Sequence, residues 1–154
     1  TLLAQPVPSW NLWQAARIAR ALGSPVSLGD WPGEAGAQGA LASGACAIVH
    51  VDPGTSGLAA AVRILTLAER EHVGAWVTSS AATPVGALAD LAVAAHAGAT
   101  LPADLSRALD ADGNPVVIPD PVGSAAPPAG VGLGYAPDPT WLRSVTVRAT
   151  ELRS

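Results

Sequence analysis

The sequence of 154 residues is 49% hydrophobic with a net charge of −4, which predicts a globular protein with a real core rather than a disordered chain. The acidic balance and the scattered arginines argue against nucleic acid and anionic membrane surfaces as partners. The single cysteine, Cys46, excludes an internal disulfide, and no apolar run is long enough to cross a bilayer, so we expect a soluble, cytoplasmic protein.

Short apolar runs alternate with helical patterns over residues 1–100. Asn11 followed by Gln14 resembles a capping box and Gly23 is a typical helix end, so a helix is predicted between them. Thr83 followed by Pro84 predicts the start of another helix. The expected strands are residues 1–4, 26–28, 47–51 and 75–78. The expected helices are residues 12–22, 32–43, 58–72 and 84–97.

Strands that alternate with helices predict an α/β fold with a parallel sheet and right-handed crossovers. Residues 1–100 therefore form about four βα units. Residues 101–154 differ, because turns rich in proline and glycine there separate single short apolar runs at 116–118 and 144–147. We expect this part to form an irregular carboxyl-terminal extension that packs on the α/β part.

Functional groups of a parallel α/β sheet collect at the carboxyl ends of its strands, where loops and helix N-termini converge. His50 and Asp52 are two residues apart at the end of the third expected strand, so their side chains face the same side. For Asp52, and for Asp30 after the second strand, the alternative is a turn or capping carboxylate. For His50 the alternative is a packed histidine satisfied by a neighbour. Other polar residues at expected strand ends are Gln5, Ser79 and Ser80.

Five parts of the sequence, taken in order, match the conserved segments of one protein family. The segments are Leu2–Pro6, Leu28–Trp31, Gly44–Gly57, Leu58–Gly74, and Asn114–Asp120 with Gly130–Gly134. In order and spacing they resemble the carboxyl-terminal half of the enolase-superfamily barrel, the fold of mandelate racemase and muconate lactonizing enzyme. The resemblance implies half of a TIM-like parallel (β/α) barrel. In that family Mg²⁺, held by three carboxylates, assists removal of the proton α to the carboxylate of a small substrate.

The resemblance assigns roles to individual positions, and at several of these positions the sequence lacks the expected residue. Asp30 matches a metal ligand, and Asp52 matches the aspartate of a proton-transfer dyad, with His50 beside it on the same strand. Ala4 stands where the family has a second metal-binding glutamate, and Ser80 stands where racemases have the histidine of the dyad. One carboxylate holds Mg²⁺ too weakly. We therefore predict no ordered divalent cation at Asp30 in this chain.

Two functions remain open from the sequence. The first is a segment of an enolase-superfamily isomerase or lyase of racemase, cycloisomerase or dehydratase type, inactive alone or catalytically degenerate. Its edge strands would be covered by the remaining half-barrel, by another copy in a homo-oligomer, or by the carboxyl-terminal extension. The second is a non-catalytic α/β module that binds an anion or a protein partner through its strand-end loops. The sequence has no methionine, so Thr1 is not an initiator position and we expect processing or a longer parent polypeptide.

Overall fold

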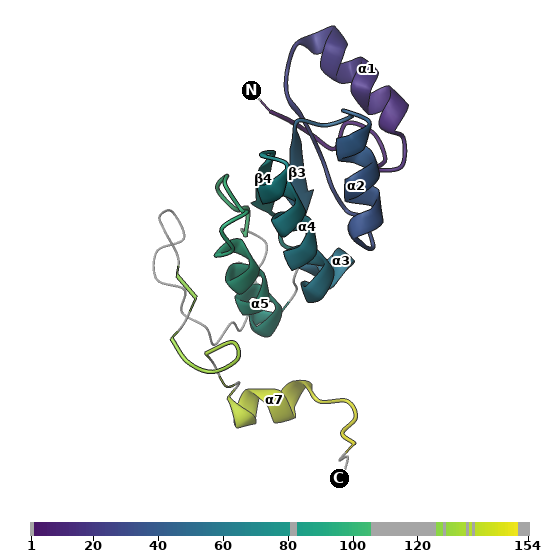
Figure 1. Ribbon diagram of the computed structural model, residues 1–154. Helices are drawn as coiled ribbons and strands as arrows, with labels where there is room; N and C mark the ends of the chain where they lie inside the picture. Colours follow the sequence, from purple (N-terminus) through teal and green to yellow (C-terminus); the bar gives the residue numbers. More distant parts are fainter. Residues whose placement is uncertain are drawn as a thin grey trace.

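A parallel sheet of four strands organises the protein (Figure 1). The computed structural model describes residues 2–80, 83–105, 126–127, 129–134, 136 and 138–150. The strands follow one another across the sheet in chain order and pair in parallel. They are β1 (Leu3–Ala4), β2 (Val26–Leu28), β3 (Ile48–Val51) and β4 (Gly74–Val77). The α/β class predicted from the alternating pattern is therefore confirmed.

Local signals mark the ends of the first helix as predicted, whereas the helices expected at 32–43, 58–72 and 84–97 cover 34–42, 58–70 and 84–94. Asn11 caps the first helix by accepting the backbone N–H of Gln14, and Gly23 ends it in the left-handed conformation at φ 59°. Thr83 caps another helix through the N–H of Gly86. No helix of the described residues is long and apolar enough to cross a membrane. The helices are α1 (Leu12–Leu22), α2 (Glu34–Ala42), α3 (Pro53–Ser56), α4 (Leu58–Arg70), α5 (Pro84–Ala94) and α7 (Pro139–Val145).

Two segments differ from the expected pattern. The turn after the third strand is a one-turn helix, α3. Asp52 caps it, and Pro53 at its first position has a fixed φ that suits a helix. The apolar run expected at 144–147 begins inside α7, which starts at an aspartate and a proline in the same way. None of the side chains of α7 is buried. The run expected at 116–118 lies outside the described residues.

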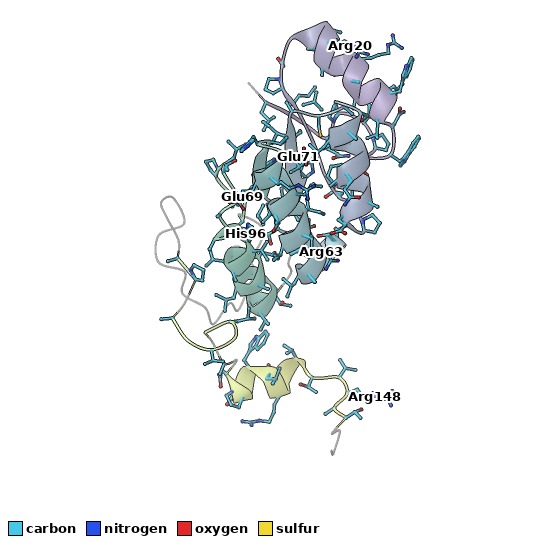
Figure 2. The ribbon with its side chains drawn as sticks, viewed as in Figure 1. Arg20, Arg63, Glu69, Glu71, His96 and Arg148 are labelled. Atoms are coloured by element: carbon cyan, nitrogen blue, oxygen red, sulfur yellow. The ribbon has the colours of Figure 1, made fainter. Side chains whose placement is uncertain are left out.

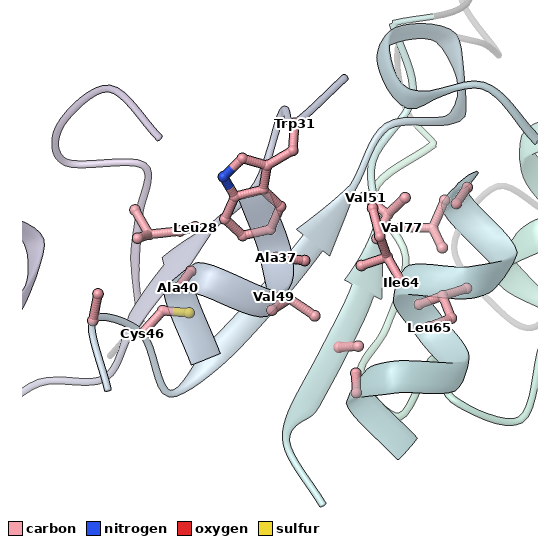
Figure 3. Packing of buried hydrophobic residues seen from close by; sticks show 14 of the residues in the cluster. Leu28, Trp31, Ala37, Ala40, Cys46, Val49, Val51, Ile64, Leu65 and Val77 are labelled. Carbon is pink, nitrogen blue, oxygen red and sulfur yellow. The ribbon is translucent and has the colours of Figure 1, made fainter. Parts of the chain in front are cut away.

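The hydrophobic core lies on one face of the sheet. Alternate strand residues, among them Val49, Val51 and Val77, are almost fully buried there. Figure 3 shows them packed against Ile64 and Leu65 of α4. Burial of this apolar area is the main force that holds the helices on the sheet.

The residues between these core positions point to the opposite face of the sheet, which we call the inner face. The strand register places Ala4 of β1 beside Ser27 of β2, and His50 of β3 beside Trp76 of β4. Ser27 lies between core residues of β2, and His50 lies between core residues of β3. Because side chains alternate along a strand, both point to the inner face. The two strand residues with polar side chains, Ser27 and His50, both lie on this inner face.

The segment after α5 covers part of the free edge of β4. The N–H of Leu101 donates to the carbonyl of Ala75, and the N–H of Asp104 donates to the carbonyl of Val77, both at 2.9 Å. Thr78 forms a parallel bridge with Asp104. Backbone groups that an edge strand would leave unpaired are thereby satisfied.

Candidate functional site

His50 is held on the inner face by side chains from two neighbouring strands. Its Nδ1 lies 2.9 Å from the hydroxyl oxygen of Ser27, and that oxygen accepts the indole N–H of Trp76 at 3.0 Å. The rings of His50 and Trp76 are 5.6 Å apart. Ser27 is fully buried and His50 is 5% exposed. The imidazole therefore has a fixed orientation, with Nδ1 engaged and Nε2 directed away from Ser27.

The imidazole of His50 fills the space that a side chain at position 29 would occupy. A Cβ atom built on Gly29 would overlap Cδ2 and the carbonyl oxygen of His50, and it would lie 2.5 Å from Nε2. Position 29 belongs to the inner face, since it is two residues beyond Ser27. Glycine at this position therefore lets a group from β3 stand at the carboxyl end of β2.

Asp30 meets this imidazole from the loop that follows β2. Its Oδ2 lies 3.9 Å from Nε2 of His50, and its side chain is 49% exposed. The backbone of Asp30 is left-handed at φ 57°, and Gln5 after β1 is left-handed at φ 45°. Gln5 also accepts the N–H of Gly29 at 3.0 Å. Left-handed backbone at a residue other than glycine costs free energy and concentrates at functional sites.

Burial controls the charge of His50. Removal of the ring from water lowers the pKa of His50 below its ordinary value, and the nearby carboxylate of Asp30 opposes this effect. Burial dominates, so the structure favours the neutral imidazole.

Asp52 lies at the carboxyl end of β3, as the sequence predicts, and it serves as a helix cap. Its Oδ1 accepts the N–H of Gly54 at 2.8 Å, and its Oδ2 accepts the hydroxyl of Thr55 at 3.2 Å. The side chain is 6% exposed. The capping role that was the alternative for Asp52 is therefore present, and a catalytic role remains a prediction.

A second polar contact lies behind the end of β4. The hydroxyl of Ser79 donates to Oδ2 of Asp90 on α5. Asp90 is 3% exposed, and burial raises its pKa, helped by the charge of Asp52 and opposed by the bond from Ser79. The neighbouring Ser80 is close to the capped turn, because a Cβ atom on Gly54 would lie 2.9 Å from its hydroxyl oxygen.

The structure brings His50 and Asp30 together, whereas the sequence associated His50 with Asp52. It also adds residues that the sequence analysis missed, namely Ser27, Trp76 and Asp90. A signal was present for two of them: Ser27 is polar within an otherwise apolar strand, and Asp90 is the single charged residue of α5.

The donor set at the strand ends does not fit Mg²⁺. The described residues contain no group of three or more His, Cys, Asp and Glu side chains that would hold a metal ion. Ala4 offers no ligand at the inner-face end of β1, and Asp30 lies 3.9 Å from an imidazole nitrogen, Nε2 of His50. Mg²⁺ demands near-octahedral oxygen ligands.

A parallel sheet with helices on one face and polar groups on the other, gathered at the strand ends, defines part of a (β/α) barrel protein. The model of the family described as "Enolase C-terminal domain-like" matches residues 1–141. The chain belongs to this family, within the enolase superfamily, as the resemblance predicted.

Similar proteins share this fold over a part of their own length. An N-succinylamino acid racemase from Amycolatopsis is 31% identical over 151 residues, which is 94% of this chain and 40% of the relative. The structure of N-succinyl Arg/Lys racemase from Bacillus cereus superposes with a TM-score of 0.78 at 19% identity, covering 94% of this chain and 40% of that one. L-Ala-D/L-Glu epimerase from Bacillus subtilis gives a TM-score of 0.65 at 22% identity, covering 72% and 32%. The chain thus spans about 40% of the length of the curated relative that it matches.

Proposed function

We propose that this chain is the carboxyl-terminal part of a racemase- or epimerase-type barrel enzyme that acts next to the carboxylate of a small substrate. The observation that carries the proposal is the inner face, where His50 and Asp30 meet at the ends of strands that form part of a barrel. The names of the relatives support an N-acylated amino acid as the substrate class.

Racemisation requires removal of a proton from the α-carbon and return of a proton to the opposite side. Asp52 is the candidate acid–base group of this chain, because it stands at the end of β3 on the strand that also carries His50. Ser80 stands where the dyad would have its histidine, and its hydroxyl is a poor base without an activating partner. The chain alone therefore lacks the second group, and we propose that it is inactive by itself.

The superfamily generally uses Mg²⁺, which when bound stabilises negative charge on the substrate. Asp30 is the one carboxylate of this chain at a matching strand end, and it does not suffice. We therefore do not propose a Mg²⁺-dependent reaction for this chain by itself. The cytoplasmic location and the homo-oligomeric assembly stay predictions.

A complementation experiment tests the proposal. The chain is mixed with the amino-terminal 60% of the Amycolatopsis racemase, produced separately, because this chain matches the remaining 40%. We expect the two pieces to associate and to exchange the α-proton of an N-succinylamino acid for deuterium, followed by proton NMR. Asp52→Asn should abolish exchange, and the 154-residue chain alone should show none. Exchange by the chain alone, or no association, would contradict the proposal.

The non-catalytic binding module remains the second candidate, because both oxygens of Asp52 accept hydrogen bonds from the α3 turn and Ala4 offers no ligand. Stable association of the two pieces without any proton exchange would favour this candidate. Association and exchange are thus separate readouts of the two functions.

A further inference from the structure

Asp90 is a buried carboxylate in an otherwise apolar helix. It is 3% exposed and is the single charged residue of α5. Its carboxylate accepts the hydroxyl of Ser79. Asparagine would accept the same hydrogen bond without placing an ionisable group in the interior, where charge costs free energy. Ionisable groups held in such surroundings concentrate at functional sites, so the position of Asp90 indicates a role beyond packing.

Ser79 connects Asp90 to the end of β4. Its side chain is almost fully buried and points to α5, where Asp90 holds the hydroxyl. The backbone N–H of Ser79 donates to the carbonyl of Asp104 at 3.1 Å, and the N–H of Thr78 donates to the carbonyl of Val51 at 2.9 Å. Backbone bonds therefore hold this strand end between its two neighbours, while Asp90 holds the side chain.

The next residue, Ser80, is exposed and stands beside Asp52. A Cβ atom built on Gly54 would lie 2.9 Å from the hydroxyl oxygen of Ser80 and 3.1 Å from Oδ1 of Asp52. Both side chains therefore lie against the same residue of the α3 turn. Because Ser79 and Ser80 are consecutive, a contact that fixes Ser79 also limits where Ser80 stands relative to Asp52.

We propose that Asp90 is a positioning residue for proton transfer at Asp52, which holds Ser80 in place through Ser79 and whose charge strengthens Asp52 as a base. Asp52 and Asp90 are 6% and 3% exposed, so water screens their charges poorly and each disfavours ionisation of the other. In agreement, the charge of Asp52 helps to raise the pKa of Asp90. Because Asp52 is the acid–base group of the proposed function, this role rests on that proposal.

The elements that pack against α5 carry few other ionisable side chains. The strand β4 and the turn α3 have none beyond the capping Asp52. Those of α4 and of the described segment after α5 are Arg63, Glu69, Arg70, His96 and Asp104. Figure 2 shows Arg63 and Glu69, which are exposed on α4, and Arg63 pairs there with Glu34. The charge that shifts the pKa of Asp90 is that of Asp52.

A titration of the 154-residue chain with ¹³C-labelled aspartate tests the coupling. We expect the carboxyl signal of Asp52 to titrate in two steps, the second of which coincides with the titration of Asp90. Asp90→Asn should remove the second step, because asparagine keeps an acceptor for Ser79 and loses the charge. Glu34→Gln is the matched control, since it removes one negative charge from an exposed salt bridge, and it should keep both steps.

Asp90→Ala tests the positioning role, because it removes the acceptor for Ser79 together with the charge. The amide signals of Ser80 and Gly54 should shift in this variant and should stay close to those of the parent in Asp90→Asn. The coupling test uses Asp90→Asn and does not depend on whether Asp90→Ala folds.

The complementation experiment links this role to catalysis. Exchange of the α-proton should rise as Asp90 ionises, because the added charge makes Asp52 a stronger base, and Asp90→Asn should lose this rise. The inference would be overturned by a single-step titration of Asp52, by a second step that persists in Asp90→Asn, by unshifted signals in a folded Asp90→Ala, or by exchange without the rise. Two steps that Asp90→Asn reduces to one, without any proton exchange, would overturn only the proposed function.

Discussion

Replacement of Gly29 by alanine tests whether the His50 ring is fixed against the end of β2. The added Cβ would overlap both a ring carbon and the carbonyl oxygen of His50, and real Cβ atoms essentially never approach other atoms within 3.0 Å. A ring that turned away would lose its hydrogen bond to Ser27, and the carbonyl belongs to the β3 backbone, which is tied into the sheet. Overpacking of this kind costs about 1 to 3 kcal/mol, and loss of the Ser27 bond adds about 1 kcal/mol. We expect Gly29→Ala to lower the free energy of unfolding by about 3 kcal/mol.

Gly39→Ala is the matched control for this substitution. Gly39 lies inside α2, and the nearest atom to an added Cβ is Cδ1 of Leu12 at 4.0 Å. Alanine in a helix interior is favoured over glycine by about 0.5 to 1 kcal/mol, so this variant should be more stable than the parent. Urea unfolding followed by circular dichroism measures both. In the double variant Gly29→Ala/His50→Ala, the clash with the ring is absent but the clash with the backbone carbonyl of residue 50 remains. The Gly29→Ala substitution should therefore cost less stability in the His50→Ala background than in the parent. A loss of less than about 1 kcal/mol for Gly29→Ala would refute the packing described for His50.

Three further predictions concern buried polar groups. Burial raises the pKa of Cys46 to about 11, so iodoacetamide at pH 8 should modify the thiol only after unfolding by urea, and rapid labelling of the folded chain would contradict this. Because burial raises the pKa of Asp90, the folded state holds this proton more tightly than the unfolded state, and its contribution to stability falls as pH rises from the ordinary carboxyl range through the raised pKa. In urea unfolding, Asp90→Asn should therefore gain stability relative to the parent as pH rises above the ordinary carboxyl range and through the raised pKa of Asp90. A relative gain by the parent over this range would contradict the direction of the shift. Asp52→Ala should cost about 1 kcal/mol of stability through loss of the α3 cap, whereas Asp52→Asn should retain most of it, and equal losses in both variants would contradict the capping role.

Local signals in the sequence determined most of the secondary structure. Asn11, Gln14 and Gly23 bound α1 at the predicted residues, because capping and helix termination depend on groups within a few positions of one another. The parallel sheet followed from the alternation of strands and helices, since a crossover helix permits only parallel neighbours. The one-turn helix α3 has an equally local signal, a capping aspartate followed by proline at its first position.

The site depended on contacts that sequence spacing does not encode. The sequence placed His50, Asp52 and Asp30 at strand ends, but the two-residue spacing of His50 and Asp52 gave no information on which neighbour the imidazole meets. The register between strands decides this, because it brings Ser27 and Trp76, which are 49 residues apart, to the same ring. The missing side chain at Gly29 then lets that ring face Asp30. Strand register and packing are tertiary properties, and so the sequence alone fixed the location of the polar residues while the folded sheet fixed their partners.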